Sequence, residues 1–253
     1  MMAPDARDDL KQSVLQALST VTDPELDEPI TDLGFVKDLS VSDDGRVSLD
    51  LVTSTFWCSP NFVYMMLEEA RDVVSTVAGI SEVRVRLEGH HDSDRINLGI
   101  NSRKSFSECY ESEANGNLVE LNRMIRTRAL RSRLHAMAAT LSKYGLSPDQ
   151  LLELSLPDVS SNGDSVVVKS PVVTLSISDV EDVKRVSRYL RLRERIGPRD
   201  GPLVVWDLDG NSPKRDEFRS VLEEARLARA NFSFNAELCR ALLSARLGSD
   251  NPA

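Results

Sequence analysis

The stretch FVKDLSVSDDGRVSLDLVTS, residues 35–54, contains two runs in which apolar and polar residues alternate. Alternation with a period of two is typical of half-buried strands. Asp43, Asp44 and Gly45 separate the runs, and a short turn is favoured there because glycine adopts positive φ angles without strain. The stretch therefore predicts a β-hairpin.

Helical patterns lie on both sides of this hairpin. Residues 8–20 carry apolar side chains at helical spacing, and residues 60–77 repeat that spacing directly after Ser59 and Pro60, which is a helix-start signal. Residues 80–87 then alternate as a third strand. We expect a small α+β domain over residues 1–101, in the order helix–strand–strand–helix–strand.

The remainder of the chain, residues 102–253, predicts a second, mostly helical α/β domain. Acidic residues clearly outnumber basic ones in residues 1–114, whereas basic residues are in slight excess after them, and such a shift is typical of two units with different surfaces. The expected helices cover 118–145, a segment from 147, 178–197, 213–229 and 235–246, and the expected strands cover 165–169, 172–177 and 202–210.

The composition narrows the class of protein. A net charge of −9 over 253 residues argues against nucleic acid or an anionic membrane as the main partner, because binding phosphate needs a basic surface. No run approaches the roughly 18 apolar residues of a membrane span, and the N-terminus lacks the apolar core of a signal peptide. The three cysteines are odd in number and far apart, so we expect a cytoplasmic protein with reduced thiols.

Cys58 is the first candidate for chemistry. It immediately precedes the predicted helix, whose unpaired N–H groups and dipole favour an anion. A thiol in that position is expected to be a better nucleophile or metal ligand. Alternatively, Cys58 is a small hydrophobic residue that packs on Val63. Position alone leaves both interpretations open.

The second candidate is the loop GHHDSD, residues 89–94. Its side chains His90, His91, Asp92 and Asp94 are of the types that bind iron, zinc or manganese. Adjacent histidines lack the spacing that makes helical metal motifs specific, so a polar exit from the third strand is the alternative.

The lengths of two elements suggest that both candidates belong to one site. The helix of residues 60–77 spans about 27 Å at 1.5 Å per residue. The following strand runs back antiparallel to the helix and covers a similar ~26–33 Å. We therefore expect the histidine loop to reach the end of the helix that carries Cys58 and to complete a mixed site for iron or zinc.

The N-terminal sequence resembles the PaaD/SufT-like family of iron–sulfur assembly factors. The resemblance covers residues 8–88 and consists of a DPE motif, a D-L-G turn, a threonine-rich strand that ends in a cysteine, a helix and a further strand. The matching positions are Asp23, Pro24, Glu25, Asp32, Leu33, Gly34 and Cys58. One departure is that Trp57 precedes the cysteine and Ser59 follows it, where family members commonly have glycine and proline.

The resemblance implies a small α+β protein, often a homodimer, that assists cluster delivery to client enzymes through its cysteine and its partner surfaces. The extended chain also resembles a branch that accompanies multicomponent binuclear-iron monooxygenases. The implied cargo is iron or an iron–sulfur cluster, bound transiently, and the implied partners are a client metalloenzyme or other assembly factors.

Three hypotheses follow. The first is a non-enzymatic maturation factor with a partner-binding second domain. The second is a metal-free docking protein for a client enzyme complex. The third is a metal-dependent enzyme built on the His90 and His91 loop.

Overall fold

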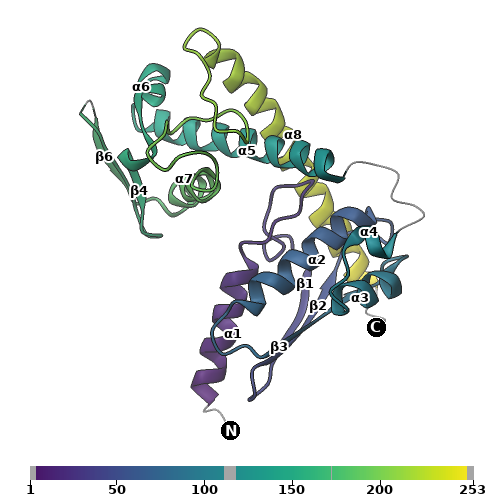
Figure 1. The fold of residues 1–253 in the computed structure, drawn as a ribbon. Coiled ribbons are helices and arrows are strands. Elements are labelled where there is room, and N and C mark those ends of the chain that lie inside the picture. The colour runs from purple at the N-terminus through teal and green to yellow at the C-terminus, as the bar shows by residue number, and fades with distance from the viewer. Residues whose placement is uncertain (1–3, 111–117, 172, 250–253) are drawn as a thin grey trace. The chain divides into compact units, whose positions relative to one another are not determined.

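The computed structural model describes residues 4–110, 118–171 and 173–249 (Figure 1). The chain divides into two compact units, the first made of residues 1–116 with 233–253 and the second of residues 117–232. Each unit has its own hydrophobic core. Within the described ranges, no helix is both long and apolar enough to cross a membrane.

The units differ in two places from the domain ranges expected from the sequence, 1–101 and 102–253. Tyr110 is buried in the core of the first unit, so that unit extends beyond residue 101. Ala236 and Leu243 are buried in the same core, so the last part of the chain returns to the first unit. Sequence periodicity marks which face of a helix is apolar but not which core that face joins.

The first unit has the predicted order helix–strand–strand–helix–strand, which confirms the α+β class. Its first elements are α1 (Pro4–Leu18), β1 (Val36–Val41), β2 (Arg46–Val52), α2 (Pro60–Ser75) and β3 (Glu82–Glu88). The sheet order is β1-β2-β3, with β1 antiparallel and β3 parallel to β2. Helix α2 ends at Ser75 with Thr76 as its C-cap, and Gly79 lies in the turn that follows, at φ 91°.

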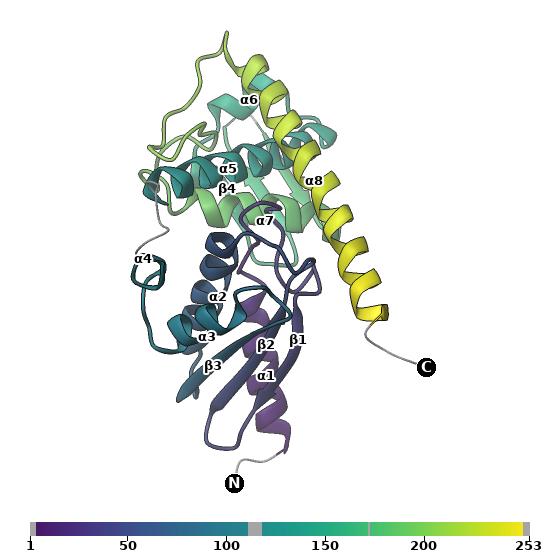
Figure 2. The same ribbon diagram turned by 90° about the vertical axis from the view of Figure 1, so that its right-hand side faces the viewer.

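The two faces of this sheet differ in polarity. Helices α1 and α2 lie together on one face (Figures 1 and 2), where strand residues such as Leu49 and Val85 are buried. The opposite face is charged and includes Arg84 and Arg86, both exposed. Burial of one face only explains the alternation from which the strands were predicted.

Two further helices of the first unit were not anticipated, α3 (Ser93–Asn101) and α4 (Phe106–Cys109). Helix α3 covers the free edge of β3. The Asn97 amide bonds both backbone groups of Leu87, and the Asn101 amide does the same for Val85. The two asparagines are one helical turn apart, so a single helix face satisfies an edge that would otherwise be open to another strand.

The second unit is a helical unit with a small sheet. It contains α5 (Leu118–Lys143), α6 (Pro148–Glu153), a 3-10 turn (Leu156–Asp158), β4 (Val159–Ser161), β5 (Val166–Lys169), β6 (Thr174–Ile177) and α7 (Val180–Arg193). The strands follow the order β4-β5-β6 and are all antiparallel. The predicted apolar stripe of α5 is fully buried at Leu130, Leu134, Met137 and Leu141.

Two expectations for the C-terminal part are corrected. Residues 202–210 form no strand, although Leu203 and Val205 are buried. The hydroxyl of Tyr189 donates to Leu203 O at 2.8 Å and accepts from Val205 N at 3.2 Å, so a side chain supplies bonds that a neighbouring strand would otherwise make. Residues 213–229 and 235–246 do not form two helices, because one continuous helix, α8 (Phe218–Ser249), covers both.

Candidate functional site

The candidate site lies where two parallel strands end. In the register of β2 and β3, Val52 is opposite Glu88, so both strands finish at the same edge of the sheet. Residues 53–59 follow β2 and residues 89–92 follow β3; we call these two segments the strand-end loops. Because parallel strands bring their carboxyl ends together, the strand-end loops are neighbours.

Hydrogen bonds join the strand-end loops directly. The Nε2 atom of His90 lies 2.7 Å from Cys58 O, and the backbone N–H of His91 donates to Phe56 O at 3.0 Å. The expectation that the histidine loop reaches the Cys58 end of α2 is therefore confirmed. The expectation that the residues of both loops bind a metal stays a prediction.

His90 acts in this structure as a support for the loop. Asp92 N–H donates to its Nδ1 at 3.1 Å, so Nε2 carries the proton that is donated to Cys58 O. The ring is buried, and desolvation lowers the pKa of His90, which keeps the imidazole neutral near pH 7. Both nitrogens are engaged, so binding a metal through His90 requires one of these bonds to break.

The other predicted ligands of the histidine loop face different partners. The Tyr110 hydroxyl donates to the Asp92 carboxylate, and burial together with that bond raises the pKa of Tyr110. His91 stacks on Trp57 with ring centroids 5.0 Å apart, while Asp94 lies in the exposed first turn of α3. Among the residues that the structure describes, no three or more His, Cys, Asp or Glu side chains are grouped so as to hold a metal ion.

The thiol of Cys58 is half-buried among hydroxyl groups. Its Sγ lies 3.3 Å from Thr55 Oγ1 and 3.6 Å from Ser54 Oγ. Helix α2 begins two residues later, where the backbone N–H groups of Phe62 and Val63 donate to Ser59 O. Cys58 also packs against the core of the first unit, as the packing alternative predicts, while its chemical role stays a prediction.

The DPE motif builds a buried carboxylate near this site. Asp23 accepts hydrogen bonds from Glu25 N at 2.7 Å and from Leu26 N at 3.0 Å, which fixes the turn. Desolvation raises the pKa of Asp23 to about 6, and the two backbone bonds only partly offset it.

The D-L-G turn has a different function in the fold. Gly34 has a φ of 76°, in the left-handed region that favours glycine, and Phe35 N–H donates back to Ile30 O at 2.9 Å. Leu33 is buried, whereas Asp32 is exposed and its carboxylate accepts from Thr31 Oγ1. The turn therefore directs Leu33 into the core and starts β1.

Comparison with known proteins identifies the family. The profile of a family described as "Iron-sulfur cluster assembly protein" matches residues 11–87. An uncharacterized protein of Methanocaldococcus jannaschii is 36% identical over 87 residues, which are 34% of this chain and 90% of that protein. The chain belongs to this family.

Relatives with descriptive names are much longer than the matched region. An iron–sulfur cluster carrier protein of Mycobacterium tuberculosis is 36% identical over 90 residues, which are 36% of this chain and 23% of the carrier. The carrier protein of Mycobacterium leprae is 32% identical over 90 residues, again 23% of its length. The match thus covers about a quarter of these carriers. No solved structure matches the chain significantly.

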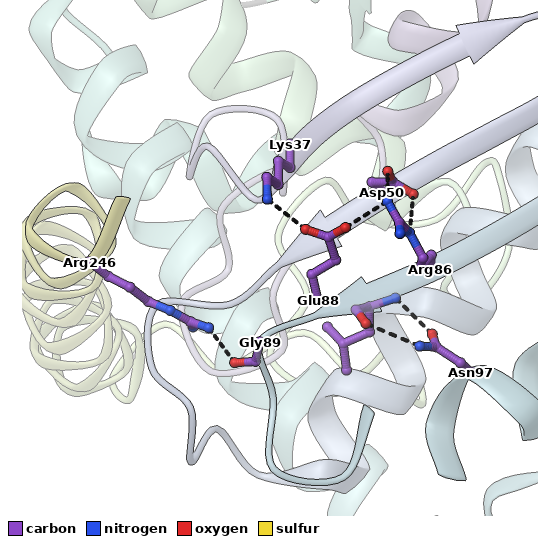
Figure 3. A network of polar contacts seen from close by, with 8 residues as sticks. Lys37, Asp50, Arg86, Glu88, Gly89, Asn97 and Arg246 are labelled. Atoms are coloured by element: carbon purple, nitrogen blue, oxygen red, sulfur yellow. Dashed lines mark hydrogen bonds and ion pairs between the residues drawn. The ribbon is translucent and has the colours of Figure 1, made fainter. Parts of the chain in front are cut away.

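One part of the site lies beyond the region that matches the family, and the sequence did not predict it. Within the first unit, α8 supplies Arg246, whose guanidinium donates to Thr53 O at 2.9 Å and to Gly89 O. Thr53 and Gly89 are the first residues of the two strand-end loops, and Figure 3 shows the bond from Arg246 to Gly89. The available signal was a helix face with Ala236, Leu243 and Arg246 at helical spacing.

Proposed function

We propose that this member of the iron–sulfur cluster assembly protein family is an accessory factor that assists the assembly of an iron or iron–sulfur centre in a client metalloenzyme. Cys58 is the residue that takes up the cargo. The observation that carries the proposal is the place of Cys58 at the meeting of the two strand-end loops, beside the start of α2.

The surroundings of Cys58 suit a thiolate that forms when metal binds. Binding iron displaces the thiol proton, and the hydroxyls of Thr55 and Ser54 are then placed to donate to the sulfur. The amino-terminal end of α2 adds a favourable field for negative charge. His90, His91, Asp92 and Asp94 are proposed as further ligands only after the hydrogen bonds of this loop rearrange.

Transient binding follows from an incomplete set of ligands. Among the described side chains, three or more donors are nowhere assembled for a metal, so the cargo keeps positions open for the ligands of a donor or client. Open coordination positions suit transfer of the cargo rather than its storage. We further propose that the protein is not an enzyme, because the iron or cluster would leave it as cargo.

The client surface is proposed to lie beside the thiol. Trp57 is 74% exposed and Phe56 is 46% exposed, and the two rings lie edge to face at 5.0 Å. Exposed aromatic side chains are favoured at protein interfaces. A multicomponent binuclear-iron monooxygenase is the client class that we propose, and a second copy of the chain is the proposed homodimer partner.

The same aromatic pair supports an alternative function, a metal-free docking protein for a client complex. In that case Phe56 and Trp57 bind the client and Cys58 only packs against the core. The three cysteines, all unpaired, support a reducing compartment, and we propose that the protein acts in the cytoplasm.

The test is metal analysis after purification without oxygen. Wild-type protein, Cys58→Ser and the control Cys109→Ser are compared for iron and acid-labile sulfide per chain. Cys109 contacts Tyr64 and lies outside the strand-end loops. Our proposal predicts iron in the wild type and in Cys109→Ser and a clear loss in Cys58→Ser. Absence of iron in all three proteins, together with retained binding of a client, would favour the docking protein.

A further inference from the structure

Helix α8 places a second cysteine at the candidate site. The face of α8 that packs on the first unit carries Ala236 and Leu243, both buried, with Cys239 between them and half-buried. Residues at these intervals share one side of a helix. Cys239 lies far beyond residues 11–87, the part of the chain that matches the family.

Two arginines hold this face of α8 in place. Arg240 donates to the Glu28 carboxylate at 2.5 Å, which joins α8 to the loop of the DPE motif. Six residues further along α8, Arg246 donates to Thr53 O and to Gly89 O, and Figure 3 shows the second of these bonds. Gly89 leaves room for this guanidinium, because a Cβ there would lie 1.9 Å from Arg246 Nη2. Cys239 precedes the first of these anchors by one residue.

Cys239 and Cys58 share a neighbour. The Ser54 hydroxyl lies 3.6 Å from the sulfur of Cys58, and it is also near enough to the thiol of Cys239 to lower the pKa of that thiol. Burial raises the pKa of the Cys239 thiol, and the nearby Asp23, Cys58 and Glu25 act in the same direction. Cys58 from one segment and the carboxyl groups of Asp23 and Glu25 from another are therefore near enough to Cys239 to disfavour negative charge on its thiol.

We propose that Cys239 and Cys58 together form a two-thiolate site for a thiophilic metal cation, with iron, free or as part of a cluster, as the cargo. The inference rests on the proposed function and deepens it, because it names the second ligand of the same site. The matched family region supplies one sulfur, and α8 supplies the other.

A cation fits this group of side chains better than any other small ligand. Thiolates are strong ligands for soft metal ions, and a bound cation would offset the mutual repulsion of the acidic groups around Cys239. Binding would release the thiol protons, and the sulfurs would need no other reaction. Two ligands from this chain leave the other coordination positions of the metal to the rest of a cluster or to ligands of the receiving protein.

The first test uses Cd²⁺ as a redox-inert probe on reduced full-length protein. Binding is followed by the ultraviolet absorbance of the cadmium–thiolate bond, for the wild type and the variants Cys58→Ser, Cys239→Ser and Cys109→Ser. We expect one ion per wild-type chain and half the absorbance per bound ion in the Cys58 and Cys239 variants. Affinity should fall at least about 100-fold in both, because loss of even an outer-shell partner costs about 10–100-fold. Cys109→Ser should behave as the wild type.

The second test needs no variant. Phenylarsine oxide joins two nearby thiols: both lose their protons, two As–S bonds form, and the oxide oxygen leaves as water. One equivalent should block two thiols per chain, and mass spectrometry should assign them to Cys58 and Cys239.

The outcomes separate this inference from the function on which it rests. Wild-type cadmium affinity and absorbance in Cys239→Ser, with loss only in Cys58→Ser, would overturn the two-thiolate site and leave Cys58 as the cargo residue. Cadmium binding that no cysteine substitution changes would overturn both. Arsenical labelling of a pair other than Cys58 and Cys239 would also contradict the site.

Discussion

The two three-stranded sheets of this protein differ in how their strands end. In β1-β2-β3, the parallel pair β2 and β3 finishes at one edge, and the two strand-end loops meet there. In β4-β5-β6 all pairs are antiparallel, so the successive turns lie alternately at the two opposite ends of the strands. The first arrangement gathers Cys58 and His90 from distant parts of the sequence. One parallel pair is thus enough to bring two loops together at one end of a small sheet.

The largest effect should come from removing the core beneath the parallel pair. Leu49, at the centre of β2, is 0% exposed, and Leu49→Ala should lower the free energy of unfolding of the first unit by about 2–5 kcal/mol. The matched variant is Val168→Ala, in the central strand β5 of the other sheet and also 0% exposed.

Hydrogen exchange with mass spectrometry can follow each unit separately. Leu49→Ala should speed exchange in both strand-end loops and expose Cys58 to alkylation, while Val168→Ala should leave both unchanged. Equal alkylation of Cys58 in the two variants would contradict the proposal that the site depends on the first sheet.

The next largest effect is expected on the pH dependence of stability, through the carboxyl group of Asp23. Its pKa is about 6 in the folded protein and 3.8 ordinarily, so the folded state holds an extra proton between these values. The wild type therefore loses stability as the pH rises from about 4 to about 6, and a shift of this size corresponds to about 3 kcal/mol. Asp23→Asn keeps an oxygen acceptor for Glu25 N and Leu26 N but removes the charge.

Urea unfolding at pH 4 and pH 7 tests the predicted direction of this change in stability with pH. Asp23→Asn should be close to the wild type at pH 4 and more stable than the wild type at pH 7. The control is Asp32→Asn, an exposed residue of the neighbouring motif. A variant that is less stable at pH 7 would mean that the charge of Asp23 stabilises the fold.

A smaller effect should follow from Arg246→Ala. The guanidinium donates to a backbone carbonyl of each strand-end loop, and its loss should cost about 2 kcal/mol, within the range for charged hydrogen bonds. The matched control on the same helix is the exposed Arg219→Ala. Hydrogen exchange should rise in residues 53–59 and 89–92 only in Arg246→Ala. Unchanged exchange there would remove α8 from the site.

The smallest effect is expected on the open face of the first sheet. Arg86 bonds Asp50 at 3.0 Å and Glu88 at 2.6 Å, and Lys37 bonds Glu88 at 2.6 Å (Figure 3). The basic side chains Arg86 and Lys37 are exposed to solvent, whereas Asp50 and Glu88 are partly buried, so water and salt screen the pairs from the basic side. Arg86→Gln should leave the thermal midpoint unchanged within error at physiological salt. A marked drop would show that this charged face matters to the sheet.

Much of the first unit could be predicted because its signals are local. The hairpin around Gly45, the start of α2 at Pro60 and the length match of α2 with β3 depend only on short-range patterns. Helix α3 was not predicted because Asn97 and Asn101 join it to the edge of β3 by hydrogen bonds. Hydrophobic periodicity does not report such polar contacts.

The candidate site was predicted only in part. The meeting of Cys58 with His90 followed from element lengths, whereas the hydrogen bonds that engage both nitrogens of His90 depend on tertiary geometry. Cys239 and Arg246 lie in α8, more than a hundred residues after the strand-end loops. No local pattern indicates which core a distant helix joins, so these two residues required the structure.

The central claim is that Cys58 at the parallel strand ends passes iron to a client. The most direct measurement is transfer from reconstituted protein to an apo-ferredoxin, followed by the absorbance of the acceptor's cluster without oxygen. Wild-type protein and Cys109→Ser should load the acceptor, and Cys58→Ser should not exceed the rate seen with free iron and sulfide. Transfer by Cys58→Ser at the wild-type rate would contradict the account.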